Sequence, residues 1–431
     1  MKRFLFISLM FVAGQGLSAQ MTLNDCLIYA RDHAHKNVIS RLEIDKASAD
    51  VRLTASNLMP YLSMYANGNM SFGRNIDPET NTYDNKQTLS TGFGLQMSVP
   101  LFDGLVNINN LKSARTAKLR AKESARIEED AVSMEVIKAF YQVTYCKAMV
   151  LQMEEQLKRD TQDLKATQKG VELGAKSGAD VAELEALVAN DEFELINQRN
   201  LLAKSYLTLR SLMGMELSEE PLDLKETEID ESQGEMMKHP KVAEAELAVK
   251  ASKYDLRAAK GSYSPSISLT GGVSTSYYKM INTEAVYPSF SRQWHDNMGE
   301  YIGLSFSFPI FNGLASTNRV KKASILLKEN EVRLEQVKYD LDKETREAEL
   351  DYISSTDELK AAYRRLEAEQ IAFNATRRKY ELGQASAIDL YTSSSKLATA
   401  KAGAEGKRIQ KIINLITLRY CRGEKLIKEV I

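Results

Sequence analysis

Two long stretches without a single proline or glycine constrain this chain more than any other feature of its sequence. The first runs for 65 residues, over 105–169, and the second for 69 residues, over 314–382. Both are rich in Ala, Glu, Lys, Leu and Arg, which favour helix. At a rise of about 1.5 Å per residue, each would form a helix about 100 Å long. The compact core of a chain this size cannot bury such a rod.

The two stretches belong to two copies of one longer pattern. VPLFDGL at 99–105 returns as FPIFNGL at 308–314, an offset of 209 residues. At the same offset, ELGAKSGAD, which ends at Asp180, matches ELGQASAID, which ends at Asp389. Solenoid repeats have periods of about 20–50 residues. The offset therefore indicates a duplication in which each copy covers about half of the chain.

Both long stretches also carry a seven-residue repeat of apolar positions. A repeat of this spacing predicts helices that supercoil around neighbouring helices. Taken alone, it would equally fit an ordinary structural coiled coil. The repeat positions are Leu111, Ala125, Val132, Ala139 and Cys146 in the first stretch, interrupted by Lys118, and Val320, Leu327, Leu334, Leu341 and Ala348 in the second.

The segments that precede each turn alternate apolar and polar residues instead. This period of two, over 61–72, 89–101, 266–274 and 302–310, predicts four β-strands with one apolar face each. The polar faces consist of Ser, Thr, Asn, Gln and Gly. Strands of about ten such residues are typical of transmembrane β-barrels. A soluble β-sandwich is the alternative, but it would not be expected to lead each strand hairpin directly into a helix of about 100 Å.

Four strands are too few to close a barrel, because the smallest membrane barrels have about eight. An open sheet in lipid would leave unpaired backbone groups at its edges, which is costly. The chain is therefore expected to oligomerise and to contribute four strands to a shared barrel, which would have 8, 12 or 16 strands.

The N-terminus predicts export. MKRFLFISLMFVAGQGLSAQ has a basic pair, an apolar run and a small-residue site that ends at Ala19, so residues 1–19 are expected to be a cleaved signal peptide. The net charge of −1 gives no support for nucleic-acid binding. Three cysteines are too few for a disulfide scaffold. Whether Cys26 and Cys421, near the two ends of the chain, pair with each other stays open.

No residue pattern indicates catalysis, a cofactor or a metal site. His33 and His35 lie two residues apart on a predicted helix and face different ways, while His239 and His295 stand alone. Cys-x-x-Cys, nucleophile-elbow and phosphate-loop motifs are missing. The 16 methionines raise the idea of copper or silver transport through thioether ligands. Several of them, however, occupy plain apolar positions of strands and helices. We expect no enzyme, no cofactor and no bound metal.

The order of these elements resembles the TolC-like outer-membrane efflux protein family. The resemblance is carried by the signal peptide, the duplicated halves and the twin turns at 100–104 and 309–313, and the loop RNIDPETNTY looks like the Bacteroidetes type. It implies a mixed α and β fold with internal structural duplication: a long α-helical coiled-coil barrel continuous with a transmembrane β-barrel. Each protomer would supply four strands, twelve in a homotrimer. The implied location is the cell outer membrane, in contact with its lipid and extending into the periplasm.

The function implied by the resemblance is the exit duct of a tripartite efflux system. Small molecules would pass from an inner-membrane transporter, of RND or ABC type, and a periplasmic adaptor protein to the exterior. The alternative is the outer-membrane duct of a type I protein secretion system, which has the same fold. A third possibility, a structural coiled coil that spans the envelope, would lack the strand alternation.

The duplication predicts five parts of the chain. They are a signal peptide over 1–19, a first repeat over 20–214, an acidic equatorial linker over 215–240, a second repeat over 241–423 and a C-terminal tail over 424–431. The first repeat should hold a helix over about 23–57, a strand hairpin over about 60–101, a long helix over about 105–169 and a helix over 179–213. The second should hold a helix over about 239–261, a strand hairpin over about 264–310, a long helix over about 314–382 and a helix over 387–422.

Both helical hairpins contain the pattern E-L-G-x-x-S-x-x-D. Its glycine is predicted to end one helix in the left-handed conformation, and its serine to cap the next helix, with the aspartate closing a capping box. The residues concerned are Gly174, Ser177 and Asp180 in the first copy and Gly383, Ser386 and Asp389 in the second.

The resemblance adds roles to these hairpins, which would form the periplasmic tip of the tunnel. The adaptor would dock at Leu173–Gly174 and Leu382–Gly383. Asp180 and Tyr380 match positions that link helices of a closed tip, and Asp389 matches a ring of aspartates that faces the lumen. The chain departs from the family at two positions, with Ala385 in place of a linking Arg and Thr392 in place of a second ring aspartate. Closure is therefore expected to be weaker, or to use Lys176, Arg377 or Arg378.

Overall fold

The computed structural model describes residues 20–76, 81–85, 87–218, 220–227, 236, 238–281 and 286–427. The predicted signal peptide lies outside the described residues, as do parts of the predicted linker (219, 228–235 and 237) and the last four residues of the tail. The chain divides into two units. We call residues 42–124 and 241–338 the strand unit, and residues 1–41, 125–240 and 339–431 the helical unit. Each unit is described by itself.

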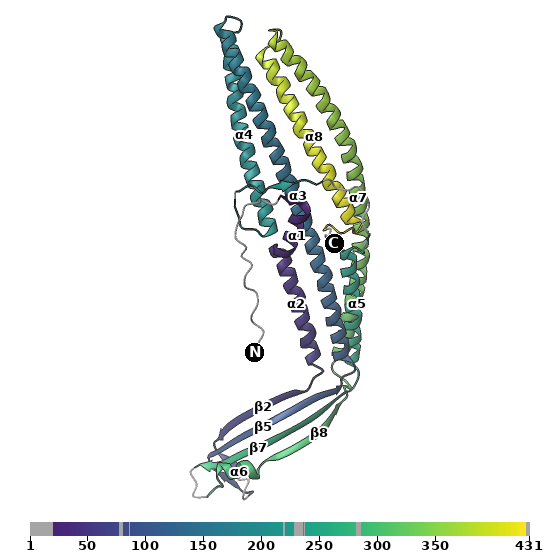
Figure 1. The fold of residues 1–431 in the computed structure, drawn as a ribbon. Coiled ribbons are helices and arrows are strands. Elements are labelled where there is room, and N and C mark those ends of the chain that lie inside the picture. The colour runs from purple at the N-terminus through teal and green to yellow at the C-terminus, as the bar shows by residue number, and fades with distance from the viewer. Residues whose placement is uncertain are drawn as a thin grey trace. The chain divides into compact units, whose positions relative to one another are not determined.

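The strand unit contains a four-stranded antiparallel sheet in the order β2-β5-β7-β8 (Figure 1). The copies meet at its centre, where β5 pairs with β7 along nearly its whole length. A bulge between Pro100 and Phe102 interrupts that pairing next to the first turn. The four strands are β2 (Tyr61–Ser71), β5 (Gln87–Phe102), β7 (Ser266–Ile281) and β8 (Gly299–Ser307). Beyond β2, a small ladder joins β3 (Arg74–Ile76) to β4 (Tyr83–Asn85).

Cross-strand pairing keeps the apolar residues of all four strands on one face. Met64 pairs with Leu95, and Leu95 pairs with Val273, so the alternation of each strand stays in phase with its neighbours. This apolar face is open to its surroundings in the single chain: Ile302 on β8 is 80% exposed. The predicted mixed α and β fold is thereby confirmed.

Two helices of 67 residues each, α3 (Val106–Glu172) and α7 (Ala315–Glu381), follow the two strand hairpins. Each begins in the strand unit and ends in the helical unit. The seven-residue repeat marks their covered stripe: Val132, Ala139 and Cys146 of α3 are buried, and so is Ala348 of α7. Within the strand unit, α5 (Pro240–Gly261) packs beside α7, and Asn330 Nδ2 donates a hydrogen bond to Ser252 Oγ at 2.6 Å.

The twin turns between strand and helix share one backbone conformation. Two successive residues are left-handed in each turn: φ is 69° at Gly104 and 64° at Leu105, and 63° at Gly313 and 64° at Leu314. The residue before each glycine then caps the long helix. In the first turn, Asp103 Oδ2 accepts a hydrogen bond from the backbone N–H of Asn107 at 2.8 Å.

The surroundings of the two turns differ. A Cβ atom placed on Gly104 would lie 2.3 Å from the carbonyl oxygen of Gly261, so the first turn and the end of α5 approach each other backbone to backbone. At Gly313, no described atom other than those of the glycine and its two chain neighbours lies within 4 Å of the same position. Accordingly, Ile310 and Phe311 of the second turn are 90% and 80% exposed.

The main core of the helical unit lies between α1 (Leu23–His33), α3, α4 (Gly178–Met213) and α8 (Ala387–Cys421). Its largest fully buried side chains include Phe140 and Tyr141 of α3 and Met213 of α4. The start of the described chain is held there by a parallel ladder between β1 (Met21–Thr22) and β6 (Leu224–Lys225). The three cysteines are free and buried.

The helix predicted over 23–57 is interrupted at Ala34, whose ψ of 130° leaves the helical region, and α2 (His35–Ser56) follows. The cause is tertiary, because a Cβ on Gly214 at the end of α4 would lie 2.5 Å from the carbonyl oxygen of His33. Side chains of α2 satisfy carbonyl groups near the break. Asn37 Nδ2 donates to the carbonyl oxygen of Ala30 at 3.0 Å, and Arg41 Nη2 donates to that of Asp32 at 2.6 Å.

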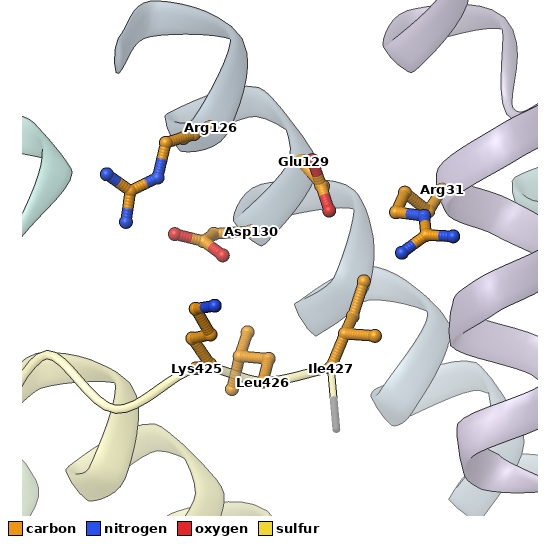
Figure 2. A pocket seen from close by; sticks show the side chains of 7 residues that line it. All are labelled: Arg31, Arg126, Glu129, Asp130, Lys425, Leu426 and Ile427. Carbon is orange, nitrogen blue, oxygen red and sulfur yellow. The ribbon is translucent and has the colours of Figure 1, made fainter. Parts of the chain in front are cut away.

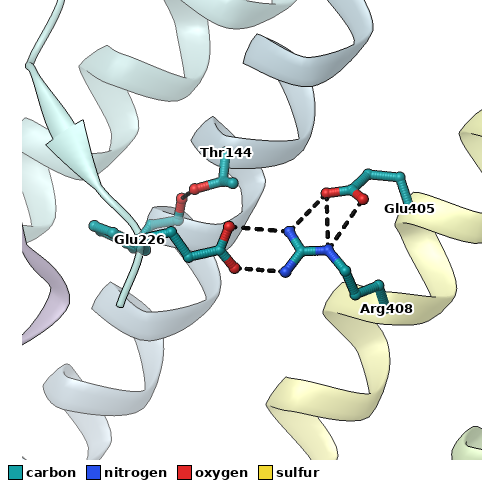
Figure 3. A network of polar contacts seen from close by, with 5 residues as sticks. Thr144, Glu226, Glu405 and Arg408 are labelled. Atoms are coloured by element: carbon teal, nitrogen blue, oxygen red, sulfur yellow. Dashed lines mark hydrogen bonds and ion pairs between the residues drawn. The ribbon is translucent and has the colours of Figure 1, made fainter. Parts of the chain in front are cut away.

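Arg408 of α8 fixes part of the predicted linker (Figure 3). Its guanidinium donates two parallel hydrogen bonds to the carboxylate of Glu226, at 2.7 Å and 3.0 Å. Glu405, on the same helix, accepts three more hydrogen bonds from this guanidinium, at 2.7, 3.0 and 3.2 Å. Because Glu226 directly follows β6, this short segment of the linker is held both by β1 and by α8.

The described part of the tail borders a cavity of about 200 Å³ with residues of α1 and α3. In Figure 2, the side chain of Asp130 lies between those of Arg126 and Lys425. Burial, helped by the negative charge of Glu129 and opposed by Arg126, raises the pKa of Asp130 to about 6. Acidic and basic side chains are mixed in this cavity, so its lining favours neither anions nor cations.

Candidate functional site

The first hairpin joins α3 to α4 through a turn built by backbone hydrogen bonds. Gly174 has a φ of 73°, and the N–H of Ala175 donates to the carbonyl oxygen of Gly170 at 2.8 Å, which is the Schellman pattern. Ser177 then caps α4. Its Oγ accepts from the N–H of Asp180 at 3.2 Å, and Asp180 Oδ2 accepts from the N–H of Ser177 at 3.1 Å, which completes a capping box.

The second hairpin, between α7 and α8, repeats this design. Gly383 has a φ of 72°, and the N–H of Gln384 donates to the carbonyl oxygen of Lys379 at 2.7 Å. Ser386 and Asp389 form the capping box, with one additional bond in which Ser386 Oγ donates to Asp389 Oδ2 at 2.8 Å. The bonds from the backbone and the side chain of Ser386 hold the pKa of Asp389 below its usual value.

The two turns present apolar side chains to their surroundings. Leu173 is 82% exposed and Leu382 is 65% exposed, although leucine is among the residues most often buried. Both stand directly before the glycine of the turn. Of the two cap aspartates, Asp389 is exposed and Asp180 is half-buried, so the two copies are not equivalent at this position.

An apolar cluster joins the two hairpins inside the helical unit. It contains residues of α4, α7 and α8, and Ala385, which stands where the resemblance expects an arginine, packs against it. The hairpins are therefore held together first by apolar burial. The cluster consists of Leu184, Leu187, Phe373, Tyr380, Ala387, Leu390 and Leu397.

Tyr380 forms the polar part of this junction and is only 6% exposed. Its hydroxyl is hydrogen-bonded to Thr167 Oγ1 of α3 at 2.8 Å. Lys176, from the first turn, donates from Nζ to the carbonyl oxygen of Tyr380 at 3.2 Å and lies 3.9 Å from the centroid of its ring. Burial raises the pKa of Tyr380, the hydrogen bond to Thr167 opposes that shift, and the charge of Asp180 adds to it.

A second polar link joins the hairpins next to Tyr380. Arg377 of α7 donates from Nη2 to Asp163 Oδ1 of α3 at 3.3 Å. It also forms an ion pair at 3.4 Å with Glu381, one turn along its own helix. Two of the three cations that the sequence suggested, Lys176 and Arg377, thus bridge the hairpins. The third, Arg378, contributes a basic charge to the last turn of α7. We call these contacts of Tyr380, Thr167, Lys176, Arg377 and Asp163 the hairpin clasp.

Sequence reasoning missed three buried polar residues deeper in the first hairpin. Asp160 of α3 and Asp191 of α4 are 6% and 2% exposed, and Gln156 Nε2 donates to Asp191 Oδ1 at 3.0 Å. Burial, together with the hydrogen bond and the charge of the neighbouring Asp191, raises the pKa of Asp160 to about 8.

None of the described helices is both long enough and apolar enough to cross a membrane. Within the described ranges, no three or more His, Cys, Asp or Glu side chains are grouped so as to hold a metal ion.

Comparison with known proteins identifies a family and relatives that this chain resembles. Residues 38–215 and 235–424 match the family described as "Outer membrane efflux protein". The cation efflux system protein CusC of Escherichia coli K12 is 22% identical over 393 residues, which cover 89% of this chain and 82% of CusC. The outer membrane efflux protein BepC of Brucella suis is 21% identical over 398 residues, covering 90% of this chain and 83% of BepC.

Solved structures share the fold over nearly the whole chain. A crystal structure of CusC superposes with a TM-score of 0.78 at 20% identity and covers 94% of this chain and 92% of its own. The outer membrane protein VceC of Vibrio cholerae superposes with a TM-score of 0.77 at 13% identity and covers 94% of this chain and 96% of its own. The expected family resemblance is confirmed: this chain belongs to the outer membrane efflux protein family.

Proposed function

We propose that this chain is one protomer of a trimeric exit duct in the outer membrane. Three copies would close a twelve-stranded barrel, and the helices would form a tunnel that receives small molecules from an inner-membrane transporter through a periplasmic adaptor. Family membership supports an efflux role. Among the relatives, CusC is named for cation efflux, and TtgC of Pseudomonas putida for a toluene efflux pump. These names favour efflux over the alternative, a duct for protein secretion.

The observation that carries the proposal is the open sheet of the single chain. β2 and β8 are its outer strands, and each pairs with only one neighbour. In lipid, unpaired backbone groups along such an edge are costly. Pairing β8 of one copy with β2 of the next would satisfy both edges and would generate a closed, head-to-tail ring.

The twin turns support the same ring. In the first half, the end of α5 covers the turn at Gly104, whereas the turn at Gly313 is left exposed. α5 precedes the second strand hairpin in the same way that α2 precedes the first. In a head-to-tail ring, the end of α2 from the next copy would cover the turn at Gly313, just as α5 covers Gly104 within one chain.

We assign the hairpins to the periplasmic tip. Leu173 and Leu382 supply exposed apolar contacts for an adaptor. The hairpin clasp would hold the two hairpins of one protomer together in the closed tip. Asp389, which is exposed, would contribute to a ring of three carboxylates around the opening and would favour cations there.

Single-cysteine labelling on intact cells, combined with the mass of the detergent-solubilised protein, tests this topology. The three native cysteines are buried, and burial raises the pKa of Cys26 to about 12, so background labelling should be small. An impermeant thiol reagent should label Asn81→Cys, in the loop of the first strand hairpin. It should not label Ala175→Cys, in the turn between α3 and α4. The solubilised protein should have the mass of three chains. The reverse labelling pattern, or a folded monomer, would overturn the proposal.

A further inference from the structure

A short helix, α6 (Phe290–Asp296), lies on the apolar face of the sheet near the loop end of β7. The ring of Phe93 on β5 lies 5.1 Å from that of Trp294 and 6.2 Å from that of Phe290, measured between centroids. Tyr277 on β7 lies 5.4 Å from Phe290. Phe93 pairs directly with Thr275, so Phe93, Thr275 and Tyr277 share the apolar face, and α6 packs on that side of the sheet.

Polar contacts fix α6 to the part of β7 that extends beyond β8. β8 pairs with β7 only as far as Ser274. Beyond that point, the amide of Gln293 replaces a neighbouring strand. Its Oε1 accepts from the N–H of Tyr278, and its Nε2 donates to the carbonyl oxygen of Tyr278, both at 2.9 Å. Asn297 Nδ2 likewise donates to the carbonyl oxygen of Ser276 at 2.8 Å. The short helix is therefore a fixed part of the sheet's surface.

An apolar cavity of about 210 Å³ lies between α6 and the sheet. Two residues with hydroxyl groups, Ser274 and Thr275, line it. Ser274 belongs by alternation to the opposite face of β7. The hydroxyl of Thr275 is already used, because it donates to the carbonyl oxygen of Trp294 at 2.9 Å. The cavity therefore offers a ligand apolar contact and almost no polar recognition. We call it the α6 groove. Its side-chain lining is Met64, Phe93, Leu95, Val273, Thr275, Trp294 and Met298.

On β7 and β8, the residues along the apolar face mark where the apolar series of each strand ends. On β7, Leu269 and Val273 are followed on the same face by Tyr277 and then Lys279. On β8 the apolar series ends earlier, at Glu300, which pairs with Val273. The order apolar, aromatic, charged is that of a strand which passes from hydrocarbon through the membrane interface into water. The α6 groove lies at this boundary.

We propose that the α6 groove binds one acyl chain of an outer-membrane lipid, with Trp294 and Phe93 as its walls. An acyl chain matches the groove because it needs no hydrogen-bond partner and because the groove is continuous with the exposed apolar face. Met64, 74% exposed, and Met298, 49% exposed, give the groove flexible apolar rims. This inference rests on the proposed orientation of the sheet, with its apolar face toward lipid.

Trp294 makes the test direct, because it is the only tryptophan of the chain. The oligomer is reconstituted into vesicles of unlabelled phosphatidylcholine, and a fatty acid with bromine atoms on its acyl chain, which quenches tryptophan emission on contact, is titrated in. Binding in the α6 groove predicts quenching that saturates and that excess oleate reverses. Val273→Phe fills the groove and should abolish the saturable part. Ile302→Phe adds the same ring to the same face outside the groove and should leave it unchanged.

Two results would overturn the inference. Only one of them would also overturn the proposed orientation of the sheet. Quenching that rises in proportion to the fatty acid without saturating, and that is the same in Val273→Phe, would remove the acyl-chain site but keep the face in lipid. Quenching by aqueous iodide, with none by the brominated fatty acid, would place Trp294 in water and overturn the proposed orientation as well. Leu95→Phe, a second groove-filling variant, guards against a local defect of Val273→Phe, and the recovery of intact oligomer is checked for every variant.

Discussion

Asp160 on α3 and Asp191 on α4 bury their carboxyl groups against each other inside the first hairpin. Apart from the other carboxyl group, the Oδ2 oxygen of each has no hydrogen-bond partner within the described structure. Burial, followed by the hydrogen bond and the charge of Asp191, raises the pKa of Asp160 to about 8. The other charged groups that act on the pair are Asp163, which raises the pKa of Asp160, and Arg159, which lowers it. Near neutral pH the pair therefore holds a proton.

The first prediction is that the hairpin loses stability as the pH rises. An unfolded aspartate has a pKa of about 3.9, whereas the folded pair keeps a proton up to about 8. The folded state thus binds more protons between these values, and its stability falls across that window by at most about 1.4 kcal/mol per pH unit. Hydrogen exchange of the α3–α4 amides, corrected for intrinsic rates, should show weaker protection at about pH 8 than at about pH 6.

Asp191→Asn should weaken this dependence, because it removes the charge of Asp191, which adds to burial in raising the pKa of Asp160, while the amide oxygen still accepts from Gln156. Glu183→Gln, an exposed change on the same helix, is the matched control and should leave the wild-type dependence intact. Equal protection of the wild-type hairpin at both pH values would show that the pair holds no proton.

The second prediction concerns the hairpin clasp. Lys176→Met removes a hydrogen bond and a cation–π contact, each worth on the order of 1 kcal/mol, while keeping most of the apolar stem. The variant should conduct more in planar bilayers, because its hairpins separate more easily. Lys165→Met changes an exposed lysine of α3 and serves as the control. A conductance of Lys176→Met equal to that of this control would rule out a role of Lys176 in closure.

The third prediction distinguishes two roles of Asp389, as part of a lumenal carboxylate ring and as a helix cap. Asn can replace Asp in a capping box, because its side-chain oxygen still accepts from the backbone. If Asp389 belongs to a lumenal ring, Asp389→Asn should lose cation preference in planar bilayers while the oligomer keeps its thermal stability. Asp180→Asn, the same change at the half-buried position of the first copy, should keep the preference. Unchanged selectivity in both variants would leave the two residues as caps alone.

The fourth prediction uses the twin turns. Alanine at Gly104 or at Gly313 carries a similar backbone penalty of roughly 1–2 kcal/mol, since both residues are left-handed. Only Gly104→Ala also drives a Cβ against the backbone of its own chain, at Gly261. It should therefore prevent folding of the protomer, whereas Gly313→Ala should yield folded protomers that assemble poorly. Sedimentation in detergent distinguishes these outcomes, with Gly403→Ala, an open position of α8, as the control.

Equal assembly of Gly313→Ala and Gly403→Ala would mean that no second copy covers the turn at Gly313. The head-to-tail ring would then need another interface.

The sequence predicted periodic elements well because their signals repeat many times. It missed the buried acid pair because the seven-residue repeat of α3 continues with polar residues, which an analysis of apolar positions does not count. Extending the first seven-residue series beyond Cys146 leads to Met153, Asp160 and Thr167, and the last two are buried at 6% and 3% exposure. A polar residue at such a position looks like the end of the stripe. Such a residue can equally form a buried polar contact, as Asp160 and Thr167 do here.

Other features depended on neighbours that no local pattern shows. The break at Ala34 lies in a stretch without proline or glycine and follows from the close approach of Gly214, about 180 residues later in the sequence. The helix α6 has only seven residues and is fixed mainly by Gln293 bonding to β7. The caps at Ser177 and Ser386 were readable, because a capping box is a contact between residues three apart. The roles of Asp389, Leu173 and Leu382 at the tip stay predictions.

The burial of the three thiols has a consequence for how this protein matures. Bacterial outer-membrane proteins reach their destination through the periplasm, where disulfides form readily. Cys26, Cys146 and Cys421 are all reduced and enclosed in the folded helical unit, so each is protected only once its surroundings have packed. Until then any two of them can be joined, and a bond between Cys26 and Cys421 would close nearly the whole chain into a loop that the native core does not contain. Productive folding must therefore be faster than oxidation, and an oxidoreductase that reopens wrong pairings would raise the yield of native protein.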